Sequence, residues 1–385
     1  MSPLPPTILT IVGITGDLAT RKLLPALRAM RSKGVLPEKF HILGTTRKAG
    51  VLVEGCEVVE MDAAEGSDYR KLDTRITEIE RKFGESAQRL FYLSVPPDSV
   101  RNIIEGLGAS GLASGGNAKL MLEKPFGTDG RSGDDLIALT HRFWARGDVY
   151  RVDHYLAKPL AEEILALSRN APLSSGAGVV KIEIAASEHI GIEGRTAFYE
   201  QTGALRDVIQ SHLLLLTALA LIDPDSAGTI QERRLGALQK LRSPMRAERG
   251  QYVGYKEEVG NTDSTTETFA AITLDSSDPR IAGIPITLLT GKMMKVKETE
   301  IRISYKRESG ALEEVIYADR ETSGTEAYEK VFLGAIEGNR DLFVSEEEVR
   351  ETWRITSPVL EVWRKSPNNL TFYEPGENIW NLFRE

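Results

Sequence analysis

Apolar and polar positions in the first part of the chain alternate between the pattern of buried strands and that of amphipathic helices. Residues 7–13 form a β-rich apolar run that ends in Gly13, and residues 14–34 carry apolar side chains at helical spacing until Gly34. The next apolar run, "FHILGTTR", completes a βαβ unit. Further strands are predicted in "RLFYLSVPP" and "AKLMLEKPFG", with a helix over "DSVRNIIEGLGASGL" between them. This alternation predicts a doubly wound α/β domain.

The pattern changes near residue 155, where we place a domain boundary. A very apolar helix is predicted over residues 203–222, followed by the β-like runs "TFAAITLD", "IPITLLTGK", "TEIRISYK" and "EVIYAD". Successive strands with few helices between them predict an antiparallel or mixed sheet. The segments "TEAYEKVFLGAIEG" and "SEEEVRETWRITSPVLEVW" are expected to be helices that cover one face of it. The prediction is an α/β domain (1–155) and an α+β domain (156–385) built on a mostly antiparallel sheet.

Composition narrows the classes of function. The apolar share of 41% and the charged share of 27% are typical of a globular protein, and no apolar run reaches the length of a membrane span. The start of the chain has no secretory pattern, so a cytoplasmic protein is expected. Cys56 is the only cysteine, which excludes an internal disulfide and a cysteine-based metal cluster. The net charge of −8 disfavours a nucleic-acid partner, and an anionic ligand would need a local positive pocket.

The turn after the first strand has the spacing of a phosphate-binding turn. Gly13, Gly16 and Ala19 recur every three residues where the strand turns into a helix, and small residues there let the backbone approach a pyrophosphate. A tight turn without a ligand is the simpler alternative. A nucleotide triphosphate loop would need Gly-Lys-Ser/Thr, whereas Gly16 is followed by Asp17. We therefore expect a Rossmann-like dinucleotide site.

The end of the second strand indicates which dinucleotide is bound. An NAD site usually has an acidic side chain there, whereas this chain has Arg47 and Lys48. A guanidinium can bind a 2′-phosphate through two hydrogen bonds, so NADP is favoured over NAD. A solvated basic loop is the alternative.

Three further residues are candidates for chemistry. Lys124 follows a buried strand and precedes Pro125, which suggests a fixed turn, cis or trans, that would direct the lysine into the crevice where parallel sheets bind ligands. His212 lies in the apolar helix, and a buried neutral histidine is the usual explanation of such a residue. A catalytic role would require a carboxylate to orient the ring, and Asp153 in "RVDHYLAKP" is the candidate.

Several ordered stretches together resemble the glucose-6-phosphate dehydrogenase family. They are "VGITGDLATRKLLPAL", "FYLSVPP", "EKPFGTD", "RVDHYLAKP", "EHIGIEGRTAFYEQTGALRDVIQSHLL", "TFAAITL", "GIPITLLTGK" and "AYEKVFLGAIEGNRDLFVSEEEVRETWRI". The resemblance runs to about residue 360 and implies oxidation of glucose 6-phosphate to its lactone by NADP, at the entry to the pentose phosphate and Entner-Doudoroff pathways. It also implies a homodimer and a reaction that needs no metal.

The resemblance assigns roles to individual residues. His212 would be the general base and Asp153 its carboxylate partner. The cofactor would lie on the first turn and Arg47, and Lys124 would contact both cofactor and sugar. The implied site residues are Gly13, Thr15, Gly16, Asp17, Leu18, Arg47 and Lys124 for the cofactor; His154, Tyr155, Lys158, Lys292 and Lys297 for the sugar phosphate; and Glu188 and Asp207 for the sugar hydroxyls.

The chain departs from the family between residues 306 and 325, where members continue with several dozen further residues. The missing segment supplies a glutamine near the sugar and, in some members, a second NADP site. A dehydrogenase of a related sugar phosphate therefore stays open as an alternative. A catalytically inactive regulator that binds NADP or sugar phosphate is a second alternative, and the retention of His212 with Asp153 argues against it.

Overall fold

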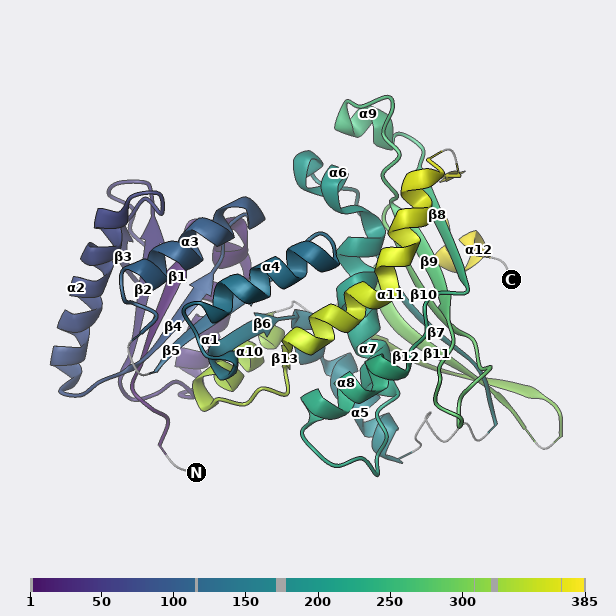
Figure 1. Cartoon of the computed structure of the whole chain (residues 1–385), viewed down its shortest axis with the longest axis horizontal. Coiled ribbons are helices and arrows are strands. Elements are labelled where there is room, and N and C mark those ends of the chain that lie inside the picture. The colour runs from purple at the N-terminus through teal and green to yellow at the C-terminus, as the bar shows by residue number, and fades with distance from the viewer. Residues whose placement is uncertain are drawn as a thin grey trace. The chain divides into compact units, whose positions relative to one another are not determined.

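The structure is a computed structural model that describes residues 3–114, 117–170, 178–307, 309–319, 325–367 and 369–383. The chain folds into two compact units (Figure 1). The first comprises residues 1–127, 131–157 and 323–346, and the second comprises residues 128–130, 158–322 and 347–385. The chain thus leaves the first unit after Ala157 and returns to it for one segment, whereas a single boundary after residue 155 was expected.

The first unit contains a seven-stranded sheet. Its strands are β1 (Thr7–Val12), β2 (Phe40–Thr46), β3 (Glu57–Glu60), β4 (Gln88–Leu93), β5 (Ala118–Glu123), β6 (Val149–Val152) and β13 (Phe343–Val344). They follow the order β13-β6-β5-β4-β1-β2-β3, in which only β13 pairs antiparallel. The strand order reverses between β1 and β4, and ligands bind at such a reversal in doubly wound sheets. The predicted Rossmann-like fold is confirmed.

Helices cover this sheet. They are η1 (Ala19–Leu23), α1 (Leu24–Ser32), α2 (Gly66–Phe83), α3 (Pro97–Ala109), α4 (Gly130–His141), η2 (Arg146–Asp148), η3 (His154–Ala157) and α10 (Thr325–Glu337). Every residue of β1 is buried, as expected for a strand of a parallel sheet covered on both faces. The prediction did not include α2, because its buried face consists of four apolar residues in an otherwise charged segment: Tyr69, Leu72, Ile76 and Ile79.

The position of α10 corrects one prediction. This helix was expected to cover the sheet of the second domain, but it packs in the first unit, where Val331 and Phe332 join the core of β1, β4 and α1. Its buried apolar residues face the interior of this unit, and the helix contacts α1. Which sheet an amphipathic helix covers depends on shape and not on periodicity, so the pattern could not decide it.

The second unit also contains a seven-stranded sheet, in the order β12-β11-β7-β10-β9-β8-β14. The bounds are β7 (Val179–Ser187), β8 (Arg246–Tyr252), β9 (Phe269–Leu274), β10 (Ile286–Gly291), β11 (Glu298–Lys306), β12 (Leu312–Asp319) and β14 (Thr371–Tyr373). The pairs β7–β10 and β8–β14 are parallel, and the other neighbours are antiparallel. The predicted mostly antiparallel sheet is confirmed.

The helices of this unit are α5 (Pro159–Asn170), α6 (Thr196–Ala204), η5 (Leu205–Leu213), α7 (Leu214–Ala220), α8 (Ile230–Lys240), α9 (Tyr255–Val259), α11 (Glu346–Lys365) and α12 (Ile379–Leu382). The apolar helix predicted over 203–222 is η5 followed by α7, and η5 has π-helical hydrogen bonding. It contacts β7, β9 and β10. Every residue of α7 is buried, because a helix that is apolar on all sides must be enclosed.

Candidate active site

A nucleotide-sized pocket of about 670 Å³ lies at the carboxyl ends of the strands of the first unit. Gly13 and Gly16 line it after β1, Arg47 and Lys48 after β2, and Ser94 after β4. A Cβ on Gly13 would lie 2.4 Å from the carbonyl oxygen of Ser94, so only glycine fits there. The turn is closed by the Gly16 N–H, which donates to the carbonyl of Gly13 at 2.9 Å. The pocket therefore presents backbone, the cations of Arg47 and Lys48, and the carboxylates of Asp62 and Asp98 to a ligand.

The pocket brings together part of the cofactor set predicted from sequence. Thr15 lines it with Gly13, Gly16 and Arg47, and its hydroxyl lies 3.3 Å from that of Thr46. Asp17, Leu18 and Lys124 do not line it. Asp17 is exposed at the start of the following helix and pairs with Arg21 at 3.5 Å.

Sequence reasoning missed Asp62 in this pocket. Asp62 follows β3, which ends beside β2 in the sheet, and its carboxylate accepts the N–H of Ala64 at 3.0 Å. The signal was present in the sequence, because the run "CEVVEMD" has the form of a strand followed by an acidic residue. Prediction of β3 would have been needed to recognise it.

At the end of β5, Lys124 precedes a cis peptide bond to Pro125. Its neighbour Glu123 accepts hydrogen bonds from the hydroxyls of Tyr92 and Tyr328, the latter at 3.3 Å. Removal of water around the carboxyl raises the pKa of Glu123 to about 7, and the two tyrosine hydroxyls oppose that shift only in part. Neither Glu123 nor the tyrosines were singled out from the sequence.

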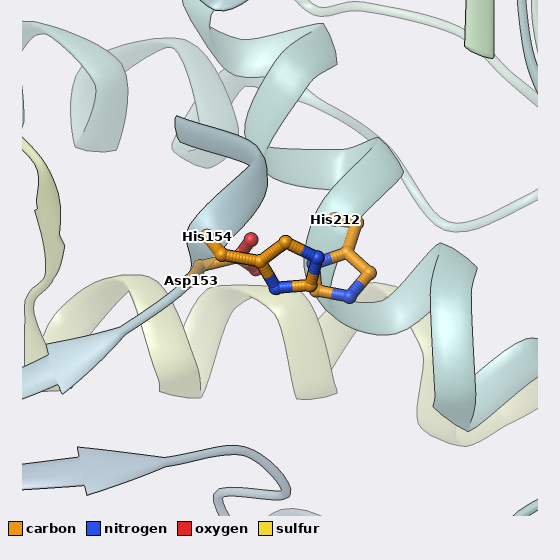
Figure 2. Close-up of side chains that lie close together, drawn as sticks. All are labelled: Asp153, His154 and His212. Carbon is orange, nitrogen blue, oxygen red and sulfur yellow. The ribbon is translucent and has the colours of Figure 1, made fainter. Parts of the chain in front are cut away.

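The segment "RVDHYLAKP" contains the end of β6 and the helical turn η3 that follows it. Asp153 is buried, and its Oδ1 accepts the backbone N–H of Tyr155 at 3.0 Å. The ring of His154 stacks on that of Tyr328, with centroids 6.0 Å apart and planes 13° apart. Figure 2 draws Asp153 and His154 at this turn of the first unit, together with His212 of the second unit.

His212 and Asp207 come from η5 in the second unit. The side chain of His212 is only 3% exposed. The start of η5 is held by Glu267, which accepts the N–H of Leu205 at 3.1 Å, and burial raises the pKa of this glutamate. Gly203, at a φ of 66°, has no room for a Cβ because the Glu267 carboxylate would lie 2.3 Å away. π-Helical turns often occur at functional sites, and here one carries the predicted base.

Two of the predicted lysines of the second unit are paired with carboxylates. Lys292 is 3% exposed, forms an ion pair with Glu188, and lies 5.1 Å from the ring centroid of Tyr199. Lys158 pairs with Asp319 of β12 at 3.5 Å. Lys297 is exposed between β10 and β11. The structure thus pairs Lys292 with Glu188, two residues that the sequence predicted, and pairs Lys158 with Asp319, which the sequence did not indicate.

No helix in the described part of the chain is long and apolar enough to span a membrane.

Comparison with known proteins extends over both units. Family models described as "Glucose-6-phosphate dehydrogenase, NAD binding domain" and "Glucose-6-phosphate dehydrogenase, C-terminal domain" match residues 10–51 and 48–162, and 171–322 and 311–379, respectively. The glucose-6-phosphate 1-dehydrogenase of Chlamydia muridarum is 29% identical, with 94% of this chain and 91% of the relative covered. Glucose-6-phosphate 1-dehydrogenase 2 of Mycobacterium bovis is 30% identical, with 93% and 88% covered.

A solved structure of glucose-6-phosphate 1-dehydrogenase from Mycobacterium avium has a TM-score of 0.80 to this chain and is 27% identical, with 97% of this chain and 95% of that chain covered. The match to the NAD-binding-domain model includes the strand ends that line the pocket of the first unit. The match to the C-terminal-domain model includes η5 and the Lys292–Glu188 pair. Because the matches extend over both units and nearly the whole length, the chain belongs to the glucose-6-phosphate dehydrogenase family.

Proposed function

We propose that this protein oxidises glucose 6-phosphate at its anomeric carbon to the lactone and uses NADP as the hydride acceptor, at the entry to the pentose phosphate and Entner-Doudoroff pathways. The observation that carries the proposal is family membership across both units, combined with a nucleotide pocket at the strand-order reversal of the first sheet. When bound, the nicotinamide supplies the chemistry of hydride acceptance. Binding of the two ligands and removal of the proton are proposed to depend on side chains of this protein.

NADP is proposed over NAD because of the charges on the pocket wall. Arg47 and Lys48 follow β2, at the position where a ribose 2′-phosphate is recognised in this fold. A guanidinium binds such a phosphate with two parallel hydrogen bonds. Asp62 and Asp98 also line the pocket and add negative charge, so we assign the discrimination to Arg47 and Lys48. The turn itself fits a pyrophosphate, since Gly13 and Gly16 line the pocket without side chains and let the ligand approach the backbone.

We propose that His212 is the general base and Asp153 its orienting carboxylate. His212 takes the proton from the anomeric hydroxyl as the hydride leaves the carbon. A carboxylate on the other ring nitrogen fixes the tautomer and stabilises the imidazolium that forms. The support is the burial of both groups and the rigid setting of Asp153, which the Tyr155 N–H anchors at 3.0 Å.

The sugar phosphate is proposed to bind to His154, Tyr155, Lys158, Lys292 and Lys297, and the sugar hydroxyls to Glu188 and Asp207. Lys124 is proposed to contact both cofactor and sugar. Several cations around a dianion supply the positive pocket that a protein with a net charge of −8 must build locally. The lysines that pair with Glu188 and Asp319 are held in place before the ligand arrives.

We further propose a homodimer in the cytoplasm. The support for association is β12, an edge strand of the second sheet on which Leu312 is 71% and Ile316 is 46% exposed. An edge strand that exposes apolar side chains, here beside the exposed Glu313 and Glu314, can pair with another chain. The mass in solution, measured by light scattering, should be that of two chains, and a monomeric mass would contradict the dimer.

The proposed function is tested by incubation with NADP and a panel of phosphorylated sugars, each also assayed with NAD. Absorbance of the reduced nicotinamide should rise fastest with glucose 6-phosphate and NADP. A preference for another sugar phosphate would favour the related dehydrogenase. Binding of both ligands without turnover would contradict the proposal and favour a regulator.

A further inference from the structure

Three elements of the first unit meet at one carboxyl group. Glu123, at the end of β5, accepts hydrogen bonds at Oε1 from Tyr92 of β4 and from Tyr328 of α10. Tyr92 is fully buried and Tyr328 is 4% exposed. A carboxyl that accepts two buried hydroxyls has a fixed orientation, and it ties the far-removed segment α10 to the strand end that carries Lys124.

Tyr328 extends this connection to η3. Its hydroxyl donates to Glu123, and its ring stacks on the imidazole of His154. The ring of His154 also meets the edge of Tyr155, with centroids 5.0 Å apart at 66°. The imidazole is therefore held between two aromatic rings, one of which is oriented through Glu123.

After burial itself, four neighbours have the largest influence on the pKa of Glu123. Tyr92 and Tyr328 donate to it, Asp153 adds a repelling negative charge, and Lys124 adds an attracting positive one. Tyrosine hydroxyls whose pKa values are raised by burial remain donors throughout the pH range of enzyme assays. In the hydrogen bond between Tyr328 and Glu123, the donor hydroxyl therefore stays protonated, whereas the charge of the acceptor carboxyl depends on its surroundings.

We propose that Glu123 is a positioning residue, which acts through Tyr328 to set the orientation of the His154 ring that receives the sugar phosphate. The inference rests on the proposed function, because it assigns His154 to the phosphate. Glu123 itself touches neither ligand in this proposal.

The test is a set of four variants. Tyr328→Phe keeps the ring but removes the hydroxyl, and Glu123→Ala removes the acceptor. Each should raise the KM for glucose 6-phosphate about fivefold, the effect of losing the hydrogen bond between a misaligned His154 and the phosphate, with kcat and the KM for NADP changed less than twofold. Glu123→Gln keeps an acceptor oxygen and should restore a KM close to that of the wild type. Tyr150→Phe is the matched control, since its buried ring packs on Phe343.

A second measurement does not depend on turnover. The ring-proton resonance of His154, identified by its loss in His154→Gln, should move in Glu123→Ala and Tyr328→Phe but not in Tyr150→Phe. Wild-type KM values and an unmoved resonance in the first two variants would overturn the inference. An absence of wild-type activity would refute the proposed function instead, and the resonance would still decide whether Glu123 orients His154.

Discussion

Lys158 and Asp319 form an ion pair in the second unit, with 3.5 Å between Nζ and Oδ2 and side chains only 16% and 6% exposed. The lysine was predicted from sequence to bind the sugar phosphate, whereas the aspartate was not predicted at all. The pair restricts the long lysine side chain before the ligand binds, so less side-chain entropy is lost on binding. Asp319 is consequently part of the proposed phosphate site without being a ligand.

Lys158→Ala is expected to raise the KM for glucose 6-phosphate at least about tenfold, because a charge-assisted hydrogen bond to the phosphate is lost. The value of kcat should fall less, since the phosphate is remote from the reacting carbon. Steady-state kinetics measure both. Lys181→Ala, which removes a lysine paired with Glu183 in the same unit, is the control. An unchanged KM would refute the phosphate assignment.

His212→Asn is expected to lower kcat by about 10²- to 10⁴-fold, because it removes the group that takes the proton in the transition state. The affinity for sugar phosphate and NADP, measured by equilibrium binding, should change little. His41→Asn is the control, since His41 belongs to the first unit and pairs there with Glu57 at 3.1 Å. Retention of more than half the activity in His212→Asn would contradict the assignment.

Arg47→Ala is expected to reduce the ratio of kcat/KM with NADP to that with NAD about tenfold or more, through loss of the bidentate contact to the 2′-phosphate. The value with NAD should stay nearly constant, because NAD lacks that phosphate. Arg28→Ala, which changes an exposed arginine of the same unit, should leave the ratio unaltered. If the ratio is unaltered in Arg47→Ala as well, the proposed NADP preference has another cause.

Asp278→Asn is expected to destabilise the protein at pH 7 by about 2 kcal/mol. Hydrogen bonds from Arg280 and Lys240 hold the pKa of Asp278 well below its ordinary value of 3.8. The depressed pKa contributes stability that is complete above the unfolded-state pKa and is lost as the pH falls through the folded-state pKa.

The difference in melting temperature between the wild type and Asp278→Asn should therefore be constant from pH 8 to pH 5 and shrink below about pH 4. Thermal unfolding at a series of pH values measures it. Asp225→Asn, a change at an exposed aspartate of the same unit, should show no such pH dependence. A difference that grows toward acid would show that the ion pairs of Asp278 do not stabilise the fold.

The sequence by itself determined the two kinds of sheet and the nucleotide turn. Strand and helix periods differ by nearly a factor of two, so the alternation of apolar runs and amphipathic segments is enough to identify the Rossmann-like unit. The positive φ of Gly13 and its contact with Ser94 are consequences of that turn. The ordered motifs were specific enough to indicate the family that the comparisons then established.

Only the tertiary structure decided which partners these residues meet. The return of α10 to the first unit, the contact of Tyr328 with both Glu123 and His154, and the pairing of Lys158 with Asp319 all join residues far apart in the chain. Local periodicity reports which face of an element is buried but not what covers it. The partner is selected by shape, and by the free-energy cost of leaving a buried polar group unpaired, and both exist only once the chain has folded.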